Sequence, residues 1–156
     1  MRRYIECKSI TAYKDVTIYD ETMEPAGTIR FRKRKKPYPI TVETRDNGLI
    51  NVLSRPLKRH GRYELFDADD APLASIDIGV KIIHSVIRSD TYYFAKASFW
   101  KMYYQLFDNR LQVGELKVVR QDGKRWFQID SSKDDIVHIL ALFLLAHAIR
   151  IKSLMN

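Results

Sequence analysis

Cysteine is almost absent from this chain of 156 residues, and so are the short motifs that mark common catalytic sites. Cys7 is the only cysteine, which excludes an intramolecular disulfide and a cysteine-rich zinc site and favours a reducing, cytoplasmic setting. No GxSxG, HExxH, GxxxxGK[ST] or GxGxxG motif occurs. We therefore expect no catalytic residue, no metal, no cofactor and a binding role instead of an enzymatic one.

Long apolar runs are also missing. The N-terminal residues mix charges with apolar side chains, unlike the apolar core of a signal peptide. The longest apolar run, Ile136–Ile149, is interrupted by His138 and His147 and is shorter than the roughly 20 residues of a membrane span. The sequence thus predicts a soluble protein without a transmembrane segment, cytoplasmic or peripheral to a membrane.

The composition suits one globular domain. Hydrophobic residues make up 46% of the chain and charged residues 29%, which is enough for one core at this length. Neither a linker nor a low-complexity stretch divides the sequence, so we predict a single domain over residues 1–156.

Three segments repeat a pattern of an aliphatic residue, an aromatic residue and an aspartate. They are Ile18-Tyr-Asp20, Leu65-Phe-Asp67 and Leu106-Phe-Asp108, followed by the small residues Gly27, Ala74 and Gly114. Aspartate favours turns because its carboxylate accepts backbone N–H bonds, and the strands that follow alternate apolar and polar residues. The pattern predicts repeated β-hairpins.

Other segments predict further strands. Asp122-Gly123 is a strong hairpin signal between residues 117–120 and 125–129, because both positions tolerate positive φ angles. Residues 40–52, interrupted near Gly48, and the aromatic residues 91–107 add more strands. We expect strands over about residues 4–130.

The C-terminal segment has a different pattern. Ser131-Ser-Lys-Asp134 resembles a capping box, and the apolar residues from Ile136 to Leu154 cover nearly the whole circumference of a helix. Such a helix is buried, and because it is too short for lipid it needs a protein wall. The sequence predicts a β-rich α+β fold, a closed antiparallel barrel of about twelve strands around a helix over about 132–154.

These features resemble the tubby C-terminal-like superfamily, which includes tubby domains, phospholipid scramblases and LURP-one-related proteins. The resemblance rests on the three repeated segments and the terminal helix, and it covers the chain from about Val16 onward. It is strongest to the small bacterial members. It implies a barrel of twelve strands around a central helix and, from tubby domains, basic strand residues that hold phosphoinositide head groups.

The positive charge is concentrated in one part of the chain. The net charge is +8, and residues 29–62 hold eleven lysine or arginine residues against two acids. We predict that two basic segments bind an anionic phospholipid surface or an acidic protein. The alternative is that these charges have no partner and only keep an edge strand in solvent. The candidate anion-binding residues are Arg30, Arg32, Lys33, Arg34, Lys35 and Lys36 in one segment and Arg55, Lys58, Arg59 and Arg62 in the other.

Two other functions stay open. The same charge together with exposed aromatic rings favours a nucleic-acid-binding module. A small-ligand carrier or enzyme, with a site at a barrel mouth near His138 or His147, is the third hypothesis. The two histidines are nine positions apart, too far for a shared metal on one helical face, and we expect them in the core or at the mouths.

Overall fold

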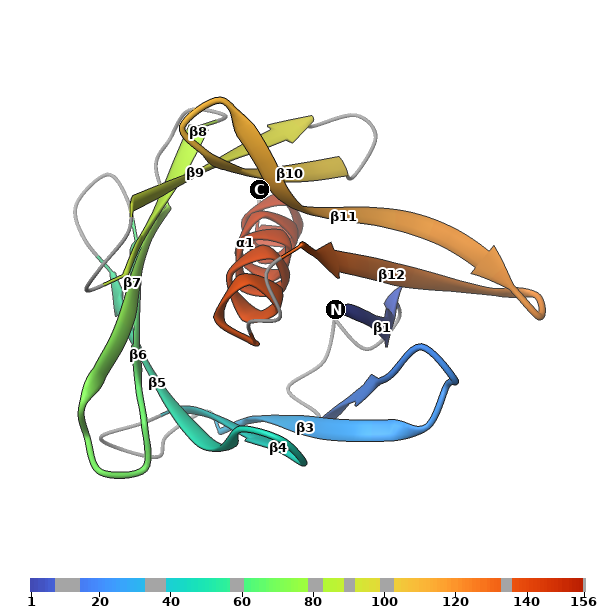
Figure 1. Cartoon of the computed structure of the whole chain (residues 1–156), viewed down its shortest axis with the longest axis horizontal. Coiled ribbons are helices and arrows are strands. Elements are labelled where there is room, and N and C mark those ends of the chain that lie inside the picture. The colour runs from blue at the N-terminus through green and yellow to red at the C-terminus, as the bar shows by residue number, and fades with distance from the viewer. Residues whose placement is uncertain are drawn as a thin grey trace.

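The chain folds into a sheet of short strands followed by a long helix, shown from blue to red in Figure 1. The computed structural model describes residues 1–7, 15–32, 39–56, 61–78, 83–88, 92–98, 103–132 and 136–155. Within these ranges there are twelve strands and one helix. They are β1 (Arg2–Glu6), β2 (Val16–Tyr19), β3 (Pro25–Phe31), β4 (Ile40–Thr44), β5 (Gly48–Pro56), β6 (Gly61–Phe66), β7 (Pro72–Ile78), β8 (Ile83–Arg88), β9 (Tyr92–Ser98), β10 (Tyr103–Asp108), β11 (Leu111–Gln121), β12 (Lys124–Ser131) and α1 (Ile136–Met155).

The strands form an antiparallel sheet in which neighbours in sequence are neighbours in space from β2 to β12. β1 pairs with β12 at five positions, from Arg2 opposite Asp130 to Glu6 opposite Trp126. On its other side β1 meets β2 through one pair of residues, Tyr4 and Tyr19. The sheet curves around α1, which lies inside it in Figure 1. The predicted β-rich α+β fold with one helix is confirmed for the described residues.

The helix is buried, as predicted. Its described side chains, from Ile136 to His147, are all buried, and Leu144 is 1% exposed. The sheet approaches the helix closely at Gly114 of β11, where an added Cβ would lie 3.4 Å from Leu142 Cδ1. In the part of the chain that the structure describes, no helix has the length and hydrophobicity that a membrane span requires.

The predicted start of the helix can be compared with the structure only at Ser131 and from Ile136 onward. Ser131 is the last residue of β12, and its Oγ lies 3.0 Å from Nδ1 of His138, so it does not begin a helix. Residues 133–135, including the predicted first-turn Asp134, lie outside the described residues, and α1 is described from Ile136. His138 and His147 are both buried, which confirms that they belong to the core.

The repeated aspartates form the predicted turns. Asp20 Oδ1 accepts hydrogen bonds from Thr22 N at 2.9 Å, Thr22 Oγ1 at 2.8 Å and Glu24 N at 3.0 Å. Asp67 Oδ1 accepts two backbone N–H bonds in the same way, both at 2.9 Å. The carboxylates thus satisfy backbone donors that a tight turn leaves without a strand partner.

The residues after each aspartate also share a geometry. Each turn contains a non-glycine residue with positive φ, and each hairpin has a register shift next to the aromatic residue. In all three hairpins the small residue lies directly opposite the aliphatic one; the pairs are Ile18 with Gly27, Leu65 with Ala74 and Leu106 with Gly114. The predicted repeat is therefore a repeat of structure.

Candidate anion-binding surface

Arg30 and Arg32 lie near the end of β3, where the prediction places the first basic segment. Arg30 follows the buried Ile29 and precedes the buried Phe31, so its side chain is on the outer face of the sheet, as expected from alternation. Arg30 Nη1 lies 3.1 Å from Glu43 Oε2, and Arg32 Nη1 lies 2.9 Å from Asp15 Oδ1. Both arginines are half-exposed, and each is paired with an acid.

Arg62, the last residue of the second basic segment, is the second residue of β6. Its Nε lies 2.6 Å from Asp77 Oδ1, and this hydrogen bond raises the pKa of the Arg62 guanidinium. The residue opposite Arg62 in the ladder is Arg55, of which the structure describes the backbone position. The remaining predicted residues, Lys33, Arg34, Lys35, Lys36, Lys58 and Arg59, lie outside the described residues.

The two basic segments join strands at the same end of the sheet. The backbone bond from Arg32 N to Pro39 O, at 2.7 Å, brings the two ends of the first segment together. Arg30 on β3 pairs with Thr41 on β4, which pairs with Asn51 on β5. Arg62 on β6 pairs with Arg55, which is four residues after Asn51 on β5. With three strand spacings across, the backbones of Arg30 and Arg62 are about 20 Å apart.

The two ends of the sheet differ in charge. Because consecutive strands are antiparallel, odd-numbered strands finish at one end, here called the basic end, and even-numbered strands at the other, the acidic end. By sequence, the connections between strands at the basic end contain eleven basic residues and two acids; the basic residues are Lys8, Lys14, Arg32, Lys33, Arg34, Lys35, Lys36, Lys58, Arg59, Lys81 and Lys101, and the acids are Asp15 and Asp122. The connections at the acidic end contain ten acids and three basic residues. The acids are Asp20, Glu21, Glu24, Asp46, Asp67, Asp69, Asp70, Asp90, Asp134 and Asp135, and the basic residues are Arg45, Arg110 and Lys133.

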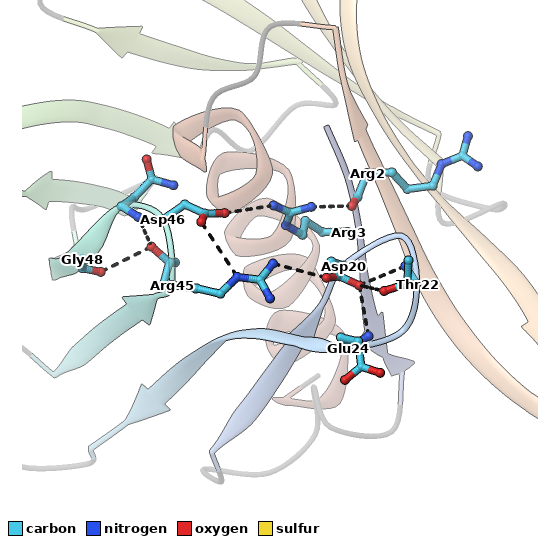
Figure 2. A network of polar contacts seen from close by, with 10 residues as sticks. Arg2, Arg3, Asp20, Thr22, Glu24, Arg45, Asp46 and Gly48 are labelled. Atoms are coloured by element: carbon cyan, nitrogen blue, oxygen red, sulfur yellow. Dashed lines mark hydrogen bonds and ion pairs between the residues drawn. The ribbon is translucent and has the colours of Figure 1, made fainter.

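A network of polar contacts connects elements at the acidic end (Figure 2). Arg45 Nη2 lies 3.2 Å from Asp20 Oδ2, and Asp46 Oδ2 lies 3.8 Å from Arg3 Nη2. The hydrogen bonds from Thr22 and then Glu24 lower the pKa of Asp20 to about 2. The network holds β1 and the β2–β3 and β4–β5 turns together, and its charges are matched within it.

A shallow hollow of about 210 Å³ lies against β11 and β12, lined by Gln112, Val113, Gly114, Glu115, Asp130 and Ser132. Glu115 Oε2 accepts a hydrogen bond from Tyr103 Oη at 2.8 Å, which raises the pKa of the Tyr103 hydroxyl. Asp130 Oδ1 lies 2.6 Å from Arg2 Nε. The acids of the hollow are thus engaged in structural contacts, and among the described residues no group of three or more His, Cys, Asp or Glu is arranged to hold a metal.

Three basic residues at the basic end were not predicted from the sequence. Arg120, Lys124 and Arg125 flank the Asp122-Gly123 turn of the β11–β12 hairpin and are exposed. The available signal was the presence of basic residues on both sides of a predicted tight turn. They were overlooked because they lie far in sequence from residues 29–62.

No family model, curated protein or solved structure matches this chain. The resemblance to tubby-like proteins therefore stays a prediction that rests on the repeated hairpins and the buried helix.

Proposed function

We propose that this chain is a non-enzymatic binding module that engages anionic phospholipid head groups through the basic end of a tubby-like barrel. The observation that carries the proposal is the separation of charge between the two ends of the sheet. By sequence, the connections at one end contain eleven basic residues and two acids, and those at the other end contain ten acids and three basic residues. A flat anionic surface attracts such an end and repels the opposite one.

The proposed closed barrel is supported by the position of β1. This strand lies between β12 and β2, with five paired positions on one side and the pair of Tyr4 and Tyr19 on the other. Contacts across the acidic end, such as Arg3 with Asp46, add to the connection between β1 and the strands that follow it. Closure removes sheet edges that otherwise favour aggregation.

A lipid surface fits the described side chains better than single-stranded nucleic acid does. Stacking on bases requires exposed aromatic faces. The described rings of Tyr63, Tyr104 and Trp126 are at most 9% exposed. No other aromatic side chain among those described is exposed either, whereas Arg120, Lys124 and Arg125 at the basic end are exposed cations.

Co-sedimentation with lipid vesicles tests the proposal. We expect the protein to bind vesicles of phosphatidylcholine with phosphatidylserine and not vesicles of phosphatidylcholine alone, with binding that weakens as salt is added. Replacing Lys33, Arg34, Lys35 and Lys36 with glutamine should reduce binding. Equal binding to both vesicles, or binding to neither, would contradict the proposed function.

A further inference from the structure

The tip of the β11–β12 hairpin is a regular, exposed structure. Asp122 and Gly123 have φ angles of 52° and 74°, which are typical of a two-residue turn of type I′. On either side of the turn, Gln121 pairs with Lys124 and Arg120 pairs with Arg125. All residues from Arg120 to Arg125 are exposed, and in Figure 1 the hairpin extends well away from α1.

The cations at this tip differ from the other cations whose contacts the structure describes. Elsewhere in the described residues, Arg2, Arg3, Arg30, Arg32, Arg45, Arg62 and Lys117 each lie within 4.0 Å of a carboxylate oxygen. No described residue forms an ion pair with Arg120, Lys124 or Arg125. Two arginines directly opposite each other destabilise a hairpin, so the fold itself gains nothing from this pair.

The hairpin holds its cations in a defined place. Alternation puts Arg120 and Arg125 on the face of β11 and β12 that carries Leu116 and Phe127, the face turned toward α1, while Lys124 is on the other face. The pairing of β12 with β1 ends at Trp126, so Lys124 and Arg125 lie beyond it.

The base of the tip is fixed by an aromatic anchor. Trp126 is 8% exposed, its Nε1 donates a hydrogen bond to Gln121 O at 3.4 Å, and its ring meets the ring of Tyr19 edge to face at 5.5 Å. The three cations therefore project from the basic end on a supported strand pair, and little ordering is required when they bind.

We infer that Arg120, Lys124 and Arg125 form a contact of the basic end with an anionic phospholipid surface. The inference rests on the proposed function and adds a site to it. Arginine binds phosphate through two parallel N–H groups, and lysine acts as a compact charge. Because the three cations point to both faces of a narrow tip and do not converge on a cavity, they fit a layer of phosphates better than one soluble phosphate.

A pair of single substitutions on the same strand pair tests the inference. Arg125→Gln removes a tip cation, and Arg110→Gln removes an exposed arginine, without an ion-pair partner among the described residues, from the β10–β11 turn at the acidic end. With phosphatidylserine-containing vesicles we expect Arg125→Gln to weaken partitioning about fivefold and Arg110→Gln to leave it unchanged. Replacing Arg120, Lys124 and Arg125 together should weaken it about a hundredfold.

The outcomes separate this inference from the proposed function. If the unsubstituted protein does not bind these vesicles, both fail. If it binds and Arg125→Gln binds equally well, the tip assignment is overturned while the function stands. Binding of single-stranded or duplex DNA in place of vesicles also overturns it. Because Arg125→Gln relieves the repulsion from Arg120, its thermal unfolding midpoint should not fall below that of the unsubstituted protein, which excludes misfolding as the cause of weaker binding.

Discussion

His147 is a buried base whose removal should make the domain resistant to acid. The side chain is 5% exposed, and its ring stacks on Phe31 with a centroid distance of 4.6 Å and an interplanar angle of 17°. Its Nδ1 is buried without a hydrogen-bond partner among the described residues. Phenylalanine has a similar ring and no polar atom, so His147→Phe keeps the stacking and removes the unsatisfied nitrogen.

The sign of the pH effect follows from the pKa. Burial lowers the pKa of His147 to about 4 from 6.5, so the folded protein keeps the ring neutral while the unfolded chain takes up a proton. Stability is therefore lost as the pH falls from about 6.5 to about 4, and the loss does not grow further below that range. A shift of about 2.5 units corresponds to about 3 kcal/mol.

Urea unfolding at a series of pH values from 7 to 4 measures this effect. At pH 7 we expect His147→Phe to be more stable than the unsubstituted protein by about 1 kcal/mol. By pH 4 the advantage should grow by about 3 kcal/mol, because contributions of the carboxylates cancel in the difference. Parallel stability curves for the two proteins, or an imidazole that titrates near its ordinary pKa by NMR, would refute this reasoning.

Three further predictions concern the core and the turns. Leu144→Asp places a charge where the side chain is 1% exposed, so it should lower the free energy of unfolding by about 4 kcal/mol or more and abolish the cooperative unfolding transition. The control Leu111→Asp, at a position that is 68% exposed, should leave the transition in place. Gly27→Ala should lower the free energy of unfolding by about 1–3 kcal/mol, because the new Cβ lies 2.8 Å from a backbone oxygen. Gly114→Ala should lower it by about 1 kcal/mol or less, because the corresponding distance is 3.2 Å. Asp20→Ala should lower the thermal unfolding midpoint at pH 7, and this difference should disappear as the pH falls from about 4 through 2, since the lowered pKa of Asp20 gives stability only while the carboxylate is charged.

Local chemistry made much of the fold predictable. The turns at Asp20 and Asp67 depend on contacts within five residues, such as Asp20 with Glu24 at 3.0 Å and Asp67 with Ala71 at 2.9 Å. The Asp122-Gly123 hairpin is predicted by the φ angles that those residues tolerate. The burial of α1 follows from a helix without a polar face, which must be covered by other elements of the chain.

The ion pairs of the basic residues at the candidate site were not predictable from the same patterns. Arg62 finds Asp77 because the two residues are opposite each other on β6 and β7, and Arg30 finds Glu43 across β3 and β4. Such pairs depend on strand register, which a count of charges along the chain does not contain. The same reason explains why the tip of β11 and β12 was missed, since only the strand order places it at the end where the earlier basic segments lie.

The direction of the helix helps to separate charges that stabilise the fold from charges that need another explanation. β12 finishes at the acidic end and α1 follows it, while His147, past the middle of α1, stacks on Phe31, the last residue of β3 at the basic end. The helix therefore runs from the acidic end toward the basic end, and this direction of its dipole is favourable for the charges at both ends.

At the acidic end, the described residues Asp20, Asp46 and Asp67 have such an explanation, because they build turns and the network with Arg45. The basic end is not. A dipole equivalent to about half a charge does not require eleven basic residues, and Arg120 opposite Arg125 works against the hairpin that carries them. The excess positive charge is the feature that stability leaves unexplained, and it is the reason for proposing an anionic surface as the partner.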